Sequence, residues 1–235
     1  MDVTPHGWRI FDERTPILTY EYSFGPGTAN SLAVGGRDGL VVVSAPCKVA
    51  DSVIDDLSRF GRVRALVASN AFHHMGIPEW KRRFPDAEIF APAQSVARVE
   101  KQTRLRGIRP LAEAVAIAGS GLELVDMPHY KTGEVLVRAK TDRGLVWYVT
   151  DVVMNLEALP SHPVGKAMFA LTRSAPGLKF NNLMSLFMVR DKKALKRWLA
   201  AQLEIAPPTW LIPTHGDIVE AGPRMQEMQR LFATR

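Results

Sequence analysis

Several stretches of the chain share one pattern, a short apolar run followed closely by a histidine or an aspartate. Such runs lead to His73, His129, Asp151 and His215, and each is typical of a strand that ends in a polar loop. At the first of them two histidines are adjacent, since His74 follows His73. An α/β fold collects its functional side chains at the carboxyl ends of strands. The pattern therefore predicts that these side chains meet at one edge of a sheet.

The apolar positions between these stretches predict the remaining elements. Strands are expected at 40–43, 63–67, 88–91, 122–126, 134–140, 145–150 and 210–213, after a β-meander over 8–34. Helices are expected at 49–60, from Pro78 to before Pro85, at 93–104, at 191–203, and from about Pro223 to Leu231. Residues 105–120 fit either helix or loop. Helices and strands that alternate in this way predict sheets with helices packed against them.

The stretch 155–182 is rich in proline and glycine and only weakly periodic. A long irregular segment in a compact domain is usually a lid, a binding loop or a contact surface. We expect an irregular insertion there. Its apolar side, which includes Met168, Leu171 and Phe187, packs onto the domain or, alternatively, forms a homodimer contact. We see no repeat and no linker, so the sequence predicts a single domain over residues 1–235.

Composition is that of an ordinary globular protein, with 46% hydrophobic and 23% charged residues in a chain of 235. The single cysteine, Cys47, excludes an internal disulfide framework and fits a reducing compartment. The first residues show no basic region followed by an apolar stretch, so no signal peptide is predicted. No apolar run reaches the roughly 20 residues of a membrane span. We therefore expect a cytoplasmic location and no membrane partner.

The net charge of +6 is partly local. One stretch carries Lys81, Arg82, Arg83, Arg98, Lys101, Arg104, Arg106 and Arg109. These cations form either a solvated helical face or a surface that attracts an anionic substrate. No aromatic residues are interleaved with them as in a nucleic-acid groove. A small anionic molecule is therefore the expected partner, and nucleic acid is not.

Imidazole and carboxylate are ligands that suit Zn²⁺, Fe or Mn, and a catalytic site leaves one position open for water. Four of the six histidines follow predicted strands, and an aspartate stands in the same position. This pattern favours a metal site built from distant parts of the chain. The alternative is that these histidines are structural.

Several motifs, in this order, resemble the metallo-β-lactamase superfamily from about residue 18 onwards. Residues 30–34 and 39–43 resemble its opening strands, and Met127–Gly133 is similar to its Pro-Gly-His-Thr-Pro-Gly loop. Tyr148–Asp151 is similar to its Thr-Gly-Asp segment, and Pro213–Gly216 to its last histidine loop. The resemblance implies an α/β fold with the architecture of a four-layer αβ/βα sandwich.

The first metal-binding motif of the family, His-x-His-x-Asp-His followed by x-Gly, is degenerate here. Alignment on Gly76 puts His74 on the final histidine and His73 on the aspartate. Ser69 and Ala71 then occupy the two leading histidine positions, and neither is a usual metal ligand. Ser44 likewise replaces an aspartate that would support the site. The resemblance thus implies that the first of the family's two metal sites has been lost.

The resemblance also implies that the second site survives, with His73, His74, Asp151 and His215 as ligands of one divalent transition metal. Zn²⁺ is the first choice, Fe and Mn are alternatives, and a site without metal remains open. Asp151 and His129 are the implied catalytic residues, and His129 and Lys131 the implied substrate-binding residues.

The implied function is hydrolysis of a small, anionic ester, thioester, lactone or amide by a metal-bound hydroxide. The alternative is a noncatalytic protein of the same fold that binds a ligand or a partner chain. Fold by itself does not choose between these functions.

Overall fold

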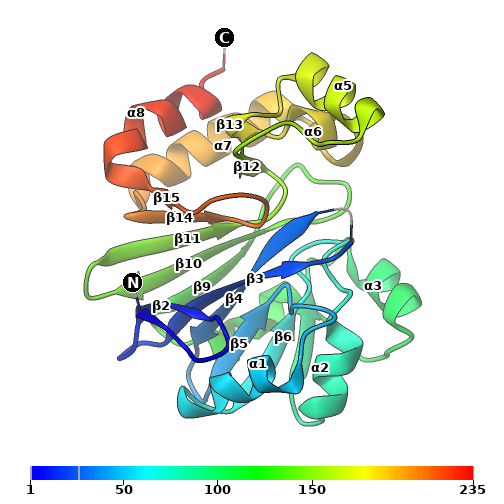
Figure 1. Ribbon diagram of the computed structural model, residues 1–235, viewed down its shortest axis with the longest axis vertical. Coiled ribbons are helices and arrows are strands. Elements are labelled where there is room, and N and C mark those ends of the chain that lie inside the picture. The colour runs from blue at the N-terminus through cyan, green and yellow to red at the C-terminus, as the bar shows by residue number, and fades with distance from the viewer. Residues whose placement is uncertain (1, 26, 235) are drawn as a thin grey trace.

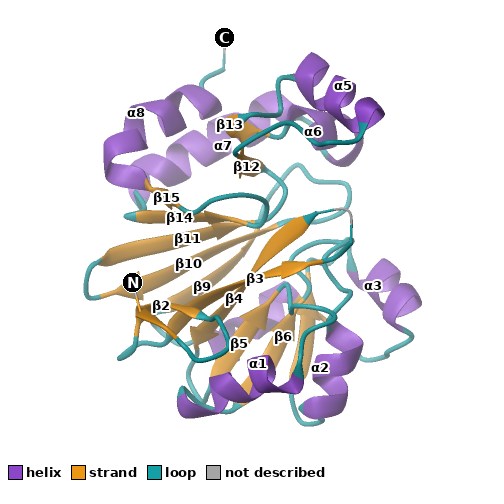
Figure 2. Ribbon diagram, in the orientation of Figure 1, coloured by secondary structure: helices purple, strands orange, loops and turns teal. Residues whose placement is uncertain are grey.

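The chain folds into four layers in a computed structural model that describes residues 2–25 and 27–234. Two β-sheets face each other, and each is covered by helices on its outer side (Figures 1 and 2). The four-layer αβ/βα sandwich predicted from the sequence is therefore confirmed.

The first sheet has eight strands among the described residues, and they lie side by side in chain order. Strands β1 to β5 are antiparallel, whereas β5 to β8 are parallel to one another. The strands are β1 (Asp2–Val3), β2 (Arg9–Asp12), β3 (Ile17–Ser23), β4 (Thr28–Gly35), β5 (Leu40–Val43), β6 (Val63–Val67), β7 (Glu88–Ala91) and β8 (Arg109–Pro110). The meander and the alternating region of the sequence thus join in one sheet.

The second sheet has the order β15-β14-β11-β10-β9. All its neighbours are antiparallel except β11 and β14, which are parallel. Its strands are β9 (Leu122–Asp126), β10 (Val135–Thr141), β11 (Gly144–Val149), β14 (Trp210–Pro213) and β15 (Val219–Glu220). Because β11 and β14 run in the same direction, the loops after them leave the sheet at the same edge.

Helices cover the outer faces of both sheets (Figure 2). The first sheet packs against α1 (Asp51–Asp55), η1 (Asp56–Arg59), α2 (Ile77–Arg83) and α3 (Val96–Thr103). The second packs against α7 (Lys192–Ile205) and α8 (Ala221–Phe232). The stretch that the sequence left open forms η2 (Leu111–Ala114) and α4 (Val115–Ala118), and η2 contacts both β7 and β9.

Apolar side chains fill the spaces between the layers. In β5, Leu40 and Val42 face the helices of the first sheet, whereas Val41 and Val43 face the second sheet. This alternation explains why β5 reads as a continuous apolar run, since both of its faces are buried. In β10 the pattern is the same, with Leu136 toward α7 and Val137 toward the first sheet.

The stretch 155–182, expected to be irregular, contains regular elements instead. Strands β12 (Val153–Leu156) and β13 (Gly177–Phe180) form a two-stranded sheet, and α5 (Pro163–Thr172) lies between them. Helix α6 (Asn182–Met188) follows β13. The prolines and glycines that weakened the periodicity lie at or near the ends of these short elements, as in Pro163 at the start of α5. In the described part of the chain, no helix combines the length and apolar character needed to cross a bilayer.

The amino-terminal turn is anchored to η1 by Asp56. Its carboxylate accepts hydrogen bonds from the Thr4 hydroxyl and from the main-chain N–H of His6, and it pairs with the His6 ring at 2.7 Å. Burial would raise the pKa of Asp56, but these hydrogen bonds outweigh it and lower the pKa below its usual value. The ionised form of Asp56 therefore stabilises the folded state.

We predict that Asp56→Asn lowers the free energy of unfolding by about 1 kcal/mol at pH 7, because a charged acceptor becomes neutral. A lowered folded pKa contributes stability above the unfolded value, and this contribution is lost as the pH falls through the folded value. The two proteins should therefore begin to converge at about pH 4 and become equal only below the lower, folded pKa of Asp56. Urea unfolding at several pH values measures this, with Asp38→Asn, an exposed site, as control. A difference that persists at low pH contradicts the prediction.

Candidate metal centre

Three loops from both sheets bring His73, Asp151 and His215 together. His73 lies in the loop after β6 of the first sheet, Asp151 follows β11, and His215 follows β14 of the second sheet. The nitrogen or oxygen that each side chain offers lies within 4.8 Å of the other two. Residues distant in sequence thus converge at one rim of the sandwich.

The spacing within this group resembles that of metal ligands. Oδ1 of Asp151 lies 3.4 Å from Nε2 of His73 and 3.3 Å from Nε2 of His215. Ligands about 2.1 Å from a tetrahedral ion lie roughly 3.4 Å from one another. A charge-assisted N–H to carboxylate hydrogen bond is normally shorter, about 2.7–2.9 Å. The two imidazoles and the carboxylate therefore fit a divalent ion by both chemistry and spacing.

The orientation of His215 is fixed by a main-chain group. Its Nδ1 lies 2.9 Å from the carbonyl oxygen of Thr28, at the start of β4. A carbonyl only accepts, so Nδ1 carries the proton and donates it. In the neutral ring the lone pair is then on Nε2, the atom that faces Asp151. The ring of Phe24 packs edge-on against His215, with centroids 5.7 Å apart.

Two buried side chains, Asn70 and Glu134, form hydrogen bonds with Asp151 on the side away from the histidines. Nδ2 of Asn70 donates to Oδ2 of Asp151 at 2.8 Å and to Oε2 of Glu134 at 3.1 Å. Oε1 of Glu134 accepts the main-chain N–H of Asp151. These contacts occupy Oδ2 and leave Oδ1 turned toward the two histidines.

Glu134 was missed by the sequence analysis. It is fully buried at the start of β10, and its signal in the sequence is a charged residue directly before the apolar run of that strand. Burial and the charge of Asp151 hold the pKa of Glu134 well above its usual value, despite its hydrogen bonds.

The pKa of Asp151 is lowered, in contrast to that of Glu134. Burial would raise it, but the charge of His73 and hydrogen bonds from His215 and His73 outweigh burial and hold it well below its usual value. For His215, burial would lower the pKa, but the hydrogen bond that the protonated ring donates to Asp151, and the charge of that carboxylate, raise it. An ionised Asp151 therefore sits between two imidazoles, next to a Glu134 that favours its protonated form.

Asn70 also shapes the loop that carries His73. Its Oδ1 accepts the main-chain N–H groups of Phe72 at 2.8 Å and of His73 at 3.0 Å. One buried side chain thus sets the conformation of the histidine loop and also binds the aspartate opposite it.

His74, the fourth expected ligand, is not part of the converging group. It is half-buried, and its Nδ1 has no hydrogen-bond partner among the described residues. Burial, followed by the charges of Arg98 and His73, lowers the pKa of His74. Among the described residues, Asp151 pairs with His73 and His215 but not with His74.

His129 and Lys131 also lie outside the group. His129 is exposed and has a positive φ of 67°, and its carbonyl accepts from Arg190. Lys131 is exposed too, with its N–H bound to the carbonyl of Met188. The buried residue of this loop is Tyr130. Burial, followed by the charges of Glu134 and Asp151, holds its pKa well above the usual value.

The length of the loop explains why Tyr130, and not His129, is its buried residue. The family motif has two residues between its histidine and the following glycine, whereas three lie between His129 and Gly133. Gly133 is fixed, because it has a φ of 71° and a Cβ there would lie 2.3 Å from Pro92. Counting back from Gly133 places Tyr130 at the position expected for the histidine.

The two positions that would hold a first metal have other contacts. Ser69 is buried and its hydroxyl lies 2.6 Å from that of Ser44. Ala71 is buried, and its carbonyl accepts from Nε of Arg98 at 3.2 Å. Among the described residues, the group of His73, Asp151 and His215 is the only cluster of three or more potential metal ligands.

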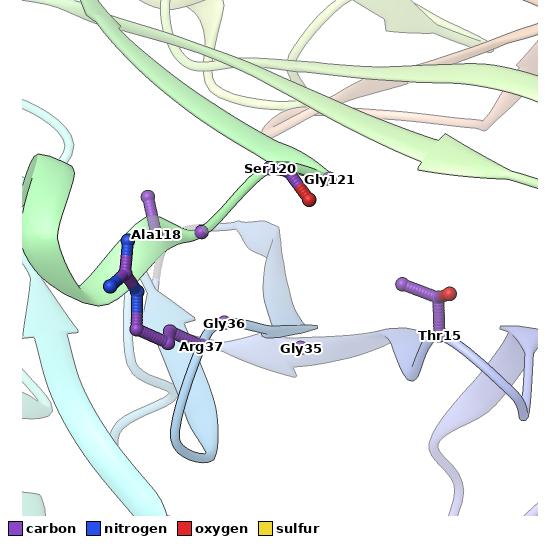
Figure 3. Close-up of a pocket in the computed structure, with 8 residues that line it drawn as sticks. Thr15, Gly35, Gly36, Arg37, Ala118, Ser120 and Gly121 are labelled. Atoms are coloured by element: carbon purple, nitrogen blue, oxygen red, sulfur yellow. The ribbon is translucent and has the colours of Figure 1, made fainter.

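A separate cavity of about 520 Å³ lies at the other end of β4, where Gly35, Gly36 and Arg37 meet the loop after α4 (Figure 3). Its polar side chains are Thr15, Arg37 and Ser120, and the remaining lining residues are glycines and Ala118. It holds no pair of side chains that could ligate a metal or exchange a proton. We therefore assign the chemistry to the rim with Asp151.

No protein-family model matches the chain, and no curated protein matches it in sequence. Solved structures do match. A metallo-beta-lactamase from Pontibacter korlensis has a TM-score of 0.62 at 13% identity, over 97% of this chain and 99% of that one. A metallo-beta-lactamase from Pseudomonas aeruginosa, solved in its mono-zinc form, has a TM-score of 0.60 at 14% identity, over 99% and 96%. A mutant flavo di-iron protein from Thermotoga maritima has a TM-score of 0.62 at 14% identity, over 98% and 61%. At such identities the likeness shows a shared fold.

We predict that Asn70→Ala lowers the free energy of unfolding by about 3 kcal/mol, because it leaves buried carboxylate oxygens and N–H groups without partners. The matched control is Asn181→Ala, which is also buried but removes the cap on the N–H of Met184 in α6 and a weak bond from Nδ2 to Sδ of Met154. Loss of that cap costs about 1 kcal/mol. Denaturant unfolding of both variants measures the difference. Equal losses would show that Asn70 has no special role.

Proposed function

Since the chain has the metallo-β-lactamase fold, we propose that it is a hydrolase that uses one divalent metal ion, with Zn²⁺ as first choice and Fe or Mn as alternatives. Its proposed substrate is a small anionic ester, thioester, lactone or amide. The observation that carries the proposal is the convergence of His73, Asp151 and His215 at ligand spacing. The mono-zinc structure among the neighbours supports a single ion in this fold.

In this proposal the ion is held by Nε2 of His73, Nε2 of His215 and Oδ1 of Asp151. When bound, a divalent ion supplies Lewis-acid activation of water and of a substrate carbonyl. Three protein ligands would leave a coordination position open, as in catalytic rather than structural zinc sites. The chain's own contribution is to hold these three atoms in place.

The positions of these three atoms depend on groups that form hydrogen bonds with the ligand side chains. Asn70 occupies Oδ2 of Asp151, so that Oδ1 is the oxygen left for the ion. The Thr28 carbonyl fixes the tautomer of His215, so that its Nε2 lone pair faces inward. Such outer partners orient ligands and raise their basicity.

We further propose that the Tyr130 phenol, rather than His129, donates a hydrogen bond to the oxygen that becomes negative during hydrolysis. This role is supported by the burial of Tyr130 in the loop that leads to Glu134, whose carboxyl group accepts the main-chain N–H of Asp151. The phenol is protonated at neutral pH, as a donor must be, because the ordinary tyrosine pKa is already near 10 and burial raises it further.

An anionic substrate is supported by Arg98 beside the histidine loop. Its Nε donates to the Ala71 carbonyl at 3.2 Å, and its guanidinium lies 4.7 Å from the centroid of the Phe72 ring. Arg98 forms no ion pair with a described carboxylate. A fixed and unpaired guanidinium suits a carboxylate or phosphate group. Lys131 is proposed to add to the same attraction, as the sequence suggested.

A noncatalytic ligand-binding role is the second candidate. It is favoured by the buried hydrogen bond between Ser44 and Ser69, a structural contact made by the residue that stands at one first-site ligand position and by the residue that replaces the supporting aspartate. In this reading the same three side chains form hydrogen bonds in a binding pocket. The buried, free Cys47 supports a reducing, cytoplasmic setting for either role.

Metal content tests the proposed ligand set. We predict that protein purified without chelators and reconstituted with Zn²⁺ binds about one equivalent. His73→Ala, Asp151→Asn and His215→Ala should each bind less than about a tenth of an equivalent, because two remaining ligands hold zinc poorly. The matched controls His74→Ala and His129→Ala should retain the wild-type amount. Elemental analysis measures the content, and anomalous scattering from crystals locates the ion.

Two results would overturn parts of this proposal. Less than about a tenth of an equivalent in the reconstituted wild type excludes the single-metal mechanism and favours the noncatalytic role. A loss in His74→Ala as large as in His73→Ala restores the set of four ligands expected from the sequence.

Catalysis tests the role of Tyr130. On 4-nitrophenyl esters, acyl thioesters and lactones, Tyr130→Phe should lower kcat about 10- to 100-fold and leave metal content unchanged. Tyr20→Phe, on β3 and packed against Trp8, is the control and should keep full activity. An unchanged kcat in Tyr130→Phe removes the phenol from the mechanism. The lack of metal-dependent turnover by the wild type on every probe would contradict the hydrolase itself.

A further inference from the structure

The loop that carries His215 is bound by two asparagines. We call residues 213–217 the His215 loop. Each of its five main-chain carbonyls accepts a hydrogen bond, and every one of these donors belongs to Asn30 on β4 or to Asn155 on β12. Loops at a protein surface commonly leave such groups to water. Here the protein itself supplies the donors, so the conformation of the loop is closely defined.

Asn30 binds carbonyls on both sides of His215. Its Nδ2 donates to the carbonyl oxygens of Pro213 and Gly216, both at 2.9 Å, and its main-chain N–H donates to that of Thr214 at 2.7 Å. Because carbonyls only accept, Nδ2 must face the loop, and the reverse orientation of the amide would turn Oδ1 toward two carbonyl oxygens. Oδ1 has no hydrogen-bond partner among the described residues. The buried side chain of Asn30 therefore forms its hydrogen bonds there with the His215 loop alone.

Asn155 binds the other two carbonyls of the loop. Its main-chain N–H donates to the carbonyl of His215 at 3.0 Å, and its Nδ2 donates to that of Asp217 at 3.0 Å. The N–H of Asp217 donates back to the carbonyl of Asn155 at 2.9 Å. Gly216 packs closely against this strand, because a Cβ there would lie 2.0 Å from the carbonyl oxygen of Asn155. The loop is thus bound both to β4 of the first sheet and to β12, which belongs to neither large sheet.

The ring of His215 is bound to the same strand as its main chain. The carbonyl of Thr28, which accepts from Nδ1 of His215, lies two residues before Asn30 on β4. Tyr148 supports this arrangement from the second sheet. Its hydroxyl donates to the carbonyl of Asn30 at 2.9 Å and accepts from the hydroxyl of Thr214 at 2.8 Å. Strand β4 therefore fixes both the backbone and the imidazole of His215.

We propose that Asn30 and Asn155 are positioning residues for His215, and that they hold its Nε2 at the spacing that a metal ion requires. This inference rests on the proposed metal-binding function. A ligand that is already fixed before the ion binds loses less conformational freedom on binding, so its affinity is higher. A role limited to folding would affect stability, but it would leave the affinity of the folded protein for the ion unchanged.

Metal affinity tests the proposal. Asn30→Ala should raise the Kd for Zn²⁺ about 10- to 100-fold, because the carbonyls of Pro213 and Gly216 lose their donor and the loop gains freedom to move. Asn155→Ala keeps its main-chain bonds and loses only the bond to Asp217, so it should raise the Kd by less. Competition with a chromophoric chelator measures the Kd, under conditions in which urea unfolding shows each variant to be folded. The visible absorption of the Co²⁺-loaded protein should also change in Asn30→Ala, because it reports the ligand geometry.

Ser31→Ala is the matched control. Ser31 is the next residue of β4 and is also buried, but its hydroxyl donates to the carbonyl of Val43 on β5, at 3.1 Å, and not to the His215 loop. This variant should lose stability, because a buried carbonyl loses a donor. Its Kd for Zn²⁺ and its Co²⁺ absorption should remain those of the wild type.

A second measurement needs no metal. The amide hydrogen of Asp217, which is bound to Asn155, should exchange faster in metal-free Asn30→Ala and at the wild-type rate in Ser31→Ala. This measurement separates the two proposals. A wild type that binds no Zn²⁺ contradicts the proposed function, whereas the exchange rate still decides whether Asn30 holds the loop.

Three results would overturn the proposal. The first is a wild-type Kd for Zn²⁺ in both folded asparagine variants. The second is a loss of affinity in Ser31→Ala as large as that in Asn30→Ala, which would assign the effect to general instability. The third is unchanged exchange at Asp217 in metal-free Asn30→Ala. If Asn30→Ala does not fold, Asn155→Ala decides, since a raised Kd supports the proposal and an unchanged one overturns it.

Discussion

The site depends on one set of buried hydrogen bonds that joins the two sheets. Asn70 lies in the loop after β6 of the first sheet, and it binds Asp151, which follows β11, and Glu134, which precedes β10, on the side of the second sheet. It also holds the main chain of Phe72 and His73. In a buried environment each of these polar groups must be paired, so the loops have little freedom to move apart. The position of His73 relative to Asp151 is thus a result of packing between the sheets.

The same contact explains the unequal behaviour of the two buried carboxyl groups. Asp151 faces two imidazoles and has a lowered pKa, whereas Glu134 faces Asp151 and has a raised one. Environments that push neighbouring pKa values apart are typical of functional sites, although structural networks also do so. Here the separation leaves one anionic oxygen, Oδ1 of Asp151, directed at the histidines.

Sequence patterns located the elements well because β6, β11 and β14 are short apolar runs with polar ends. These runs were sufficient to bring His73, Asp151 and His215 to one rim. His129 was placed poorly because one additional residue before Gly133 changes which side chain of the loop turns inward. Glu134 was missed because its role depends on Asp151, which is its neighbour in the fold but not in the sequence. The sequence left open whether the apolar side of 155–182 packs onto the domain or forms a homodimer contact, because periodicity predicts an apolar face but not the direction in which it points.

The three candidate ligands are divided between the halves of the chain, with His73 in the first sheet's half and Asp151 and His215 in the second's. Neither half alone carries a complete set. An ion held by all three would link the two halves. A ligand that binds only the folded state stabilises that state, and the stabilisation grows with the ligand concentration. The thermal tolerance of this protein would then follow the metal supply of its surroundings, and a shortage of metal would weaken the contact between the two halves together with the proposed reaction.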